Sequence, residues 1–142
     1  MVRVSLGYPT QDAEVAMLSE HSRGDRVLEL DPVADVAEVL AAQIATARVH
    51  ASEPLRRYVV ALLEGTRNDP RTELGATPRA GLMLLKAAKA LAALEGRDHA
   101  LPDDVQALAP AVLTHRLLLA PEAAGTSRAD VVRDVIERVP AL

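Results

Sequence analysis

Hydrophobic residues recur at helical spacing along most of this chain. In residues 34–49, for example, Val36, Leu40 and Ile44 follow one another at intervals of four, which places them on one face of a helix together with Val39 and Ala47. The same periodicity, bounded by caps and by helix-breaking residues, appears in five other segments. We therefore expect six helices, covering about 11–21, 34–49, 51–69, 78–95, 103–115 and 127–139.

The fourth of these segments, 78–95, differs from the others because it is apolar on almost every side. Lys86 and Lys89 are the only charged residues within its "AGLMLLKAAKALAAL" run. A helix of this kind is most simply the central helix of a bundle. The helix before it is expected to begin after Ser52 and to face inward with the following residues: Leu55, Tyr58, Val59, Leu62 and Leu63.

Glycine and proline mark the expected boundaries. Gly96 fits the C-cap of the fourth helix, and Gly75 suits a left-handed turn just before it. Pro110 is expected to bend or break the fifth helix. Segments 70–76 and 115–126 are expected to be loops or extended connectors.

The N-terminal segment alternates in the manner of a strand, with Val2, Val4 and Leu6 on one side before Gly7 and Pro9. A single strand cannot satisfy its own backbone groups, so we interpret this segment as the end of a sheet whose other strands lie upstream. The whole chain is 49 % hydrophobic but contains no Phe or Trp. The expected fold class is accordingly all-α, a helical bundle packed with Ala, Leu and Val and preceded by a short extended segment.

Charge and composition exclude several classes of function. The net charge is −4 and no cluster of Lys and Arg is present, which argues against nucleic-acid binding. Without cysteine, neither disulfides nor a thiolate metal site can form. No signal peptide and no membrane-spanning run is seen, so no membrane insertion is expected and the cytoplasm is the expected location. The chain also lacks a P-loop sequence for binding nucleoside triphosphates.

Three groups of residues resemble catalytic or metal-binding sites but have simpler explanations. Ser127 lies in "GTSRA", which approximates a nucleophile elbow, yet Ser127 or Thr126 fits the N-cap of the last helix. Asp103 and Asp104 are adjacent, so they point to different sides, and acidic residues are usual at a helix start. The four histidines have no partner at ligand spacing and predict no metal site: His21, His50, His99 and His115.

Arg79 is the one residue that local rules do not explain. If Thr77 caps the fourth helix and Pro78 opens it, Arg79 lies in a first turn that carries no carboxylate, where the helix dipole already presents positive charge. A phosphate bound there would gain from the amides, the dipole and the guanidinium together. The alternative is that Arg79 is simply exposed or pairs with Glu73 or Asp69.

A family resemblance favours the phosphate. Residues 2–118 closely resemble the C-terminal part of the MoxR family of AAA+ ATPases, through motifs in the same order: "GYP", "GATPRA", "GRD", "PDDV" and "HR". The resemblance implies that 1–9 is the end of the last strand of an AAA+ core with its hinge, and that 10–142 is the helical lid. It also implies that Arg79, with Thr77 and Pro78, is the sensor 2 motif that contacts the phosphates of ATP.

The family also implies cofactors and partners for a longer parent protein. ATP and Mg²⁺ would bind an upstream AAA+ core in cis, and no catalytic residue is expected in this segment because Walker A and Walker B are absent. Other implied partners are neighbouring subunits of a ring, usually a hexamer, and a protein with a von Willebrand factor A domain. The family activity is chaperone-like remodelling or maturation of partner proteins. The alternative hypothesis is a freestanding helical interaction domain without nucleotide chemistry.

Overall fold

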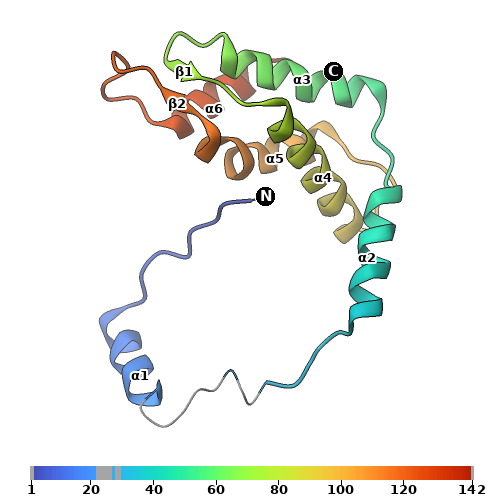
Figure 1. Ribbon diagram of the computed structural model, residues 1–142, viewed down its shortest axis with the longest axis vertical. Helices are drawn as coiled ribbons and strands as arrows, with labels where there is room; N and C mark the ends of the chain where they lie inside the picture. The colour runs from blue at the N-terminus through green and yellow to red at the C-terminus, as the bar shows by residue number, and fades with distance from the viewer. Residues whose placement is uncertain (1, 22–26, 28–29, 142) are drawn as a thin grey trace.

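The computed structural model describes residues 2–21, 27 and 30–141, which form a packed helical body and a long N-terminal arm (Figure 1). The arm contains α1 (Gln11–His21) and α2 (Val36–Arg48). The helices of the body are α3 (Glu53–Arg67), α4 (Pro78–Leu94), α5 (Pro102–Leu113) and α6 (Arg128–Arg138), with a 3₁₀ turn, η2 (Thr114–Arg116), after α5. The all-α class is confirmed, and each predicted helix is present with ends within two residues of those expected.

A small antiparallel sheet closes one end of the body, and the sequence did not predict it. It pairs β1 (Thr72–Leu74) with β2 (Leu118–Leu119), and Ala120 N donates to Arg71 O at 2.9 Å beyond the strands. Both strands fall in segments expected to be loops or extended connectors. They are too short to show an alternating pattern, so only their pairing across the fold defines them.

The hydrophobic core lies entirely in the body. Among the described residues, every buried side chain belongs to Val49 or to a later position. α4 is central, as predicted, because it contacts α2, α3 and α5 and carries Leu84, Ala88 and Ala92 without exposed surface. Small alanines let the neighbouring helices approach α4 closely. The predicted inward face of α3 is also buried: Leu55, Tyr58, Val59, Leu62 and Leu63.

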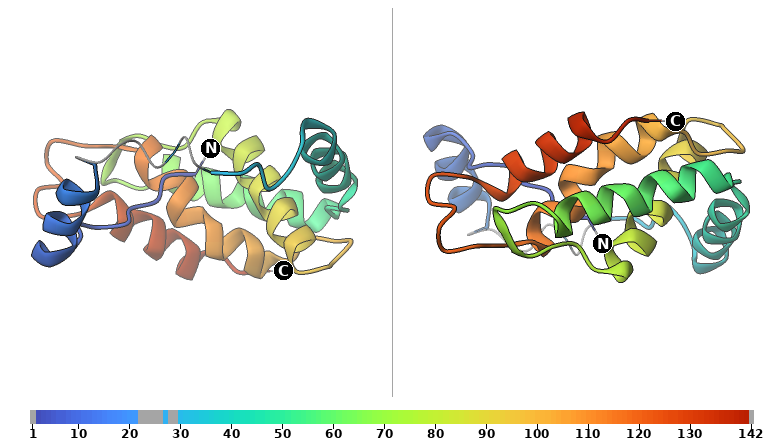
Figure 2. Two further views of the ribbon diagram at one scale, coloured as in Figure 1. Left: turned by 90° about the horizontal axis from the view of Figure 1, so that it is seen from below. Right: turned by 90° about the horizontal axis from the view of Figure 1, so that it is seen from above.

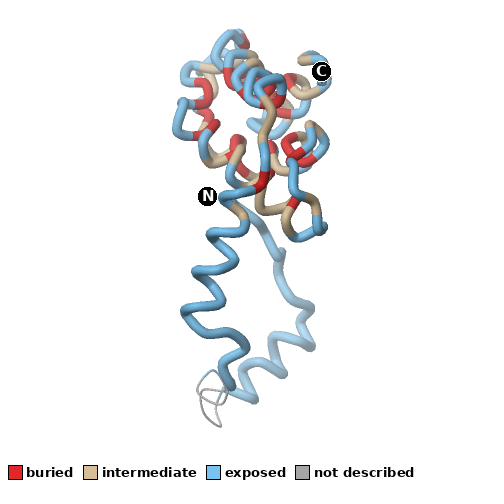
Figure 3. The backbone as a smooth tube through the Cα atoms, turned by 90° about the vertical axis from the view of Figure 1, so that its right-hand side faces the viewer, coloured by how far each residue is buried: buried red, intermediate tan, exposed pale blue. Residues whose placement is uncertain are grey.

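The arm behaves differently, because neither α1 nor α2 buries a residue (Figure 3). The predicted apolar face of α2 is present but largely uncovered, with Val36, Leu40 and Ile44 exposed by 76 %, 52 % and 55 %. Residues 2–10 form no strand, and Arg3 N instead donates to Ala111 O at 2.9 Å on the body. The described residues supply no neighbouring strand that could complete a sheet there.

Of the two glycines expected at turns, one has the predicted conformation and the other does not. Gly96 has a positive φ of 74° after α4, as predicted for its C-cap. Gly75 is not left-handed, and the prediction was wrong; a glycine is needed there because a Cβ would lie 2.5 Å from the Cα of Arg67. Pro110 does not break α5, which continues to Leu113.

No helix within the described part of the chain is long and apolar enough to cross a membrane.

Candidate functional site

Arg79 lies in the first turn of α4 with its side chain exposed. That turn contains no acidic residue, and Arg79 makes no hydrogen bond or ion pair with any described residue. The alternative pairing with Asp69 is wrong, because the Asp69 carboxylate is occupied by Arg71 and Arg138. Pairing with Glu73 is equally absent from the described contacts. The guanidinium is therefore free at the positive end of a 17-residue helix.

The residues before Arg79 leave the helix start open. Thr77 occupies the N-cap position with an extended backbone (φ −77°, ψ 162°), but its hydroxyl accepts no capping hydrogen bond, contrary to the prediction. Its carbonyl accepts from Ala80 N at 2.9 Å. Pro78 stands in the first turn as predicted and has no N–H to satisfy. Without a side-chain cap, the Arg79 amide stays available to an external acceptor, whereas the Ala80 amide already donates to Thr77 O.

The loop that leads into this helix is fastened to the end of α3. The Thr66 hydroxyl, fully buried, donates to Leu63 O at 2.7 Å and accepts from Ala76 N at 2.9 Å. Arg67 Nε donates to Ala76 O at 2.8 Å. Both backbone polar groups of Ala76 are thus held by α3, which fixes the position from which α4 and Arg79 begin.

Gly75 is the tightest point of this attachment, and its replacement gives a direct test. Gly75→Ala is expected to lower the free energy of unfolding by about 1–3 kcal/mol, because the added Cβ meets backbone atoms of Arg67 that cannot rotate away. Urea denaturation would measure the change. Gly81→Ala is the matched control, since its Cβ meets side-chain atoms alone, with Leu63 Cδ1 at 2.7 Å as the only close one. Equal stability of the two variants would contradict the close approach.

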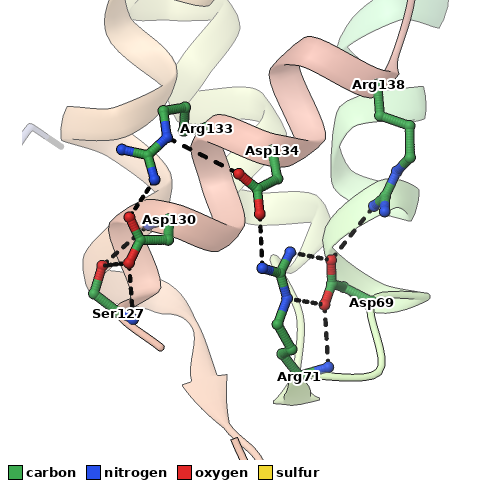
Figure 4. Close-up of polar contacts among 7 residues, drawn as sticks. All are labelled: Asp69, Arg71, Ser127, Asp130, Arg133, Asp134 and Arg138. Atoms are coloured by element: carbon green, nitrogen blue, oxygen red, sulfur yellow. Dashed lines mark hydrogen bonds and ion pairs between the residues drawn. The ribbon is translucent and has the colours of Figure 1, made fainter. Parts of the chain in front are cut away.

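On the same end of the body, an ion-pair cluster joins the start of β1 to α6 (Figure 4). Arg71 lies between two carboxylates, with Nε 2.8 Å from Asp69 Oδ1 and Nη1 2.7 Å from Asp134 Oδ2. Arg138 Nη2 approaches Asp69 Oδ2 at 3.4 Å. Hydrogen bonds from Arg71 lower the pKa of Asp69 to about 2, although burial of the carboxylate opposes the shift. This cluster was missed by the sequence analysis.

The simpler explanations of Ser127 and of the aspartate pair are confirmed. Ser127 caps α6, its Oγ donating to Asp130 Oδ2 at 2.7 Å and accepting from Asp130 N at 3.1 Å. Asp104 is buried and accepts two hydrogen bonds from Arg97, at 2.8 and 2.6 Å, which lower its pKa, whereas Asp103 is exposed. The two carboxylates therefore serve separate purposes.

Two of the histidines meet through their backbones, although they are far apart in sequence. His50 N donates to Asp98 O at 2.7 Å, and Ala100 N donates to His50 O at 2.9 Å, which pairs the segments around His50 and His99. This contact anchors the arm beside the end of α4. In the described part of the chain, no group of three His, Asp or Glu residues could hold a metal ion.

Comparison with known proteins defines the class to which this fold belongs. The family model for the AAA lid domain matches residues 64–135, which include α4, α5 and the Arg79 site. A solved structure of a candidate ATPase from Cytophaga hutchinsonii superimposes on the whole chain with a TM-score of 0.84 and 25 % identity. The body therefore has the helical fold of an AAA lid domain. The chain belongs to the AAA lid domain family.

Its relatives by sequence include MoxR proteins. The chain is 34 % identical to the uncharacterized protein YeaC of Bacillus subtilis over 98 % of its own length, and 30 % identical to chaperone MoxR1 of Mycobacterium tuberculosis over 84 %. It is 41 % identical to protein MoxR of Paracoccus denitrificans over 51 %. The matches cover only 44 %, 33 % and 25 % of these relatives and 46 % of the Cytophaga protein. The chain thus spans less than half of each of these four proteins.

Proposed function

We propose that Arg79 is the sensor 2 residue of this lid and binds the phosphates of ATP held by an AAA+ core in a longer parent protein. The observation that supports this proposal is the free guanidinium at the uncapped start of α4. A cation at that end of a helix costs about 0.3–1 kcal/mol when exposed. A phosphate would turn this cost into an attraction, because its oxygens accept from both the amide and the guanidinium of Arg79.

The chemistry of the site fits phosphate but not a metal ion. The groups it can offer to a ligand are donors, namely the amide and the guanidinium of Arg79, and the first turn has no carboxylate as a ligand for Mg²⁺. In this proposal Mg²⁺ and the attacking water are bound by the upstream core, which carries Walker A and Walker B. This chain contributes no catalytic residue of its own, and Thr77 and Pro78 serve to orient the helix start toward the phosphates.

The way α4 is attached suggests how the phosphate contact would be used. The loop before Arg79 is bound to α3, and α4 packs at the centre of the body, so force on Arg79 is transmitted to the whole lid. Loss of the γ-phosphate would release the lid from the core. We propose that this movement drives chaperone-like remodelling or maturation of partner proteins in a ring, usually a hexamer, together with a von Willebrand factor A domain protein. The name of the relative chaperone MoxR1 supports this activity.

A freestanding interaction domain is the second candidate. It is supported by the uncovered apolar residues of the arm, such as Leu18, Leu40 and Ile44. This alternative predicts no upstream ATPase core and no dependence of any activity on Arg79, so one experiment separates the two candidates.

That experiment is the binding of ATP to the longer parent protein. Arg79→Ala is expected to raise the dissociation constant of ATP at least about tenfold, because a charge-assisted hydrogen bond to the phosphates is lost. Isothermal titration calorimetry would measure the affinity, and circular dichroism would check that the lid stays folded. Arg56→Ala, which removes an exposed arginine from α3, is the matched control. Equal affinities for Arg79→Ala and wild type would favour the interaction domain.

A further inference from the structure

A groove of about 610 Å³ lies between α2 and α4, and it is positively charged. Lys86 and Lys89 line it, and no carboxylate of the described residues does. Lys86 makes no hydrogen bond or ion pair with any residue in the described part of the chain. Lys89 Nζ donates to Ala47 O at 2.7 Å, so its described partner is a neutral carbonyl that leaves the charge uncompensated. The groove therefore attracts an anionic group.

The remaining surface of the groove is mostly apolar but has little bulk. It is formed by Val39, Ala42, Gln43, Thr46, Ala47 and Ala90. The residues from α2 recur at intervals of three and four, which is the spacing of one helix face. Because half of the six residues are alanines, a partner has room to place large side chains there, as the close packing of protein contacts requires.

The groove is open to another molecule. α2 lies at the outer edge of the molecule in all three ribbon views, and α1 lies far from it (Figure 2). α2 packs on α4 but buries none of its residues. From Val39 to Ala47 the lining of α2 extends about 12 Å, which is two helical turns. A short helix laid along this length would pack against ridges of both α2 and α4.

We propose that this groove binds a short amphipathic helix of a partner protein that carries a carboxylate beside its apolar residues. Large apolar side chains of the partner fill the space over the alanines, and its Asp or Glu pairs with Lys86 and Lys89. The two lysines are three residues apart and lie on one side of α4, so one carboxylate can reach both. Apolar anchors at helical spacing supply the contact area, and the charge selects an acidic partner over a basic one.

This binding is separate from nucleotide binding. Arg79 does not line the groove, so the proposal goes beyond the proposed function and does not depend on it. Loss of partner binding with ATP binding unchanged would contradict this proposal or its variants alone, and the reverse result would concern Arg79 alone.

Selection from a random peptide library tests the chemistry of the partner. Peptides of about 12 residues, displayed on phage and selected on the wild-type chain, are expected to be enriched in Asp and Glu beside Leu, Ile or Phe at helical spacing. Selection on Lys86→Glu should enrich no acidic residues. A library that yields no binders, or binders without acidic residues, would overturn the proposal.

Fluorescence anisotropy of the best selected peptide then tests where it binds. Lys86→Glu should raise its dissociation constant at least about tenfold, because carboxylates would then face each other. A peptide with Lys in place of its acidic residues should recover binding to Lys86→Glu. Lys86 is exposed, so its substitution leaves the core untouched. An affinity that is insensitive to Lys86→Glu would contradict the proposed ion pair.

A second pair of variants tests the apolar part of the groove. Ala42→Glu places a carboxylate within the lining and should weaken binding of the same peptide at least about tenfold. Ala41→Glu is the matched control, because it makes the same change at the neighbouring exposed residue of α2, which does not line the groove. It should bind like the wild type. Equal affinities for the two variants would show that the peptide binds elsewhere and would refute the proposal.

Discussion

Replacing Asp69 by alanine is expected to lower the free energy of unfolding by about 3 kcal/mol. The Asp69 side chain is 1 % exposed and accepts from the backbone N–H of Arg71 at 3.0 Å as well as from its guanidinium. Without the carboxylate, the Arg71 amide and its guanidinium, which is 29 % exposed, lose the buried partner that they share. The ion pair between Arg71 and Asp134 remains but cannot replace the bonds within the turn.

Chemical denaturation at neutral pH would measure this loss. Asp98→Ala is the matched control, because the Asp98 side chain is 98 % exposed and its ion pair with His99 lies at the surface, where such pairs contribute little. The two variants should differ clearly in their denaturation midpoints. An Asp69→Ala variant as stable as Asp98→Ala would show that the cluster in Figure 4 does not stabilise the fold.

The same carboxylate predicts how stability changes with pH. The pKa of Asp69 is lowered to about 2 in the folded state from an ordinary value of 3.8, so the folded state holds this group ionised more strongly than the unfolded state does. Its contribution, about 2 kcal/mol, is present above pH 3.8 and is lost as the pH falls through 2. Asp69→Asn should remove this part of the acid dependence, whereas an unchanged acid profile would contradict it.

The helices could be predicted from sequence because their signals are local. Ser52 and Ser127 precede their helices by one residue, and apolar residues follow at intervals of three and four. The sheet and the Asp69 cluster could not be predicted, because Thr72 meets Leu119, and Arg71 meets Asp134, only after the helices between them have packed. No rule of spacing connects positions separated by this much chain.

The signal for the candidate site is also local, because the charge of Arg79 conflicts with the dipole of its own helix. The capping role of Thr77 was wrong, because a suitable side chain in the right position need not turn toward the amides. The apolar face of α2 shows a further limit. Periodicity correctly located Leu40 and Ile44 on one face, but it assumes a partner within the chain, and the described residues leave that face half uncovered.

α4 shows where periodicity fails within a correctly predicted helix, and it yields the second large effect. A helix that is apolar on nearly every side carries no pattern to tell which leucines face the core. The structure distinguishes them, because Leu84 is 0 % exposed and Leu82 is 61 % exposed. Leu84→Ala is therefore expected to lower the free energy of unfolding by about 2–5 kcal/mol, through lost burial and the cavity left behind.

Leu82→Ala makes the same change of side chain in the same helix and should cost no more than about 0.5 kcal/mol. Thermal and urea unfolding of both variants would measure the difference, and helix propensity cancels because Leu and Ala occupy equivalent interior positions in each. Equal losses would mean that Leu82 is covered by a partner in solution, whereas the expected difference confirms which face of α4 forms the core. Leu84 lies on the face of α4 that forms the core. Arg79, five residues earlier in the same helix, is exposed at the surface.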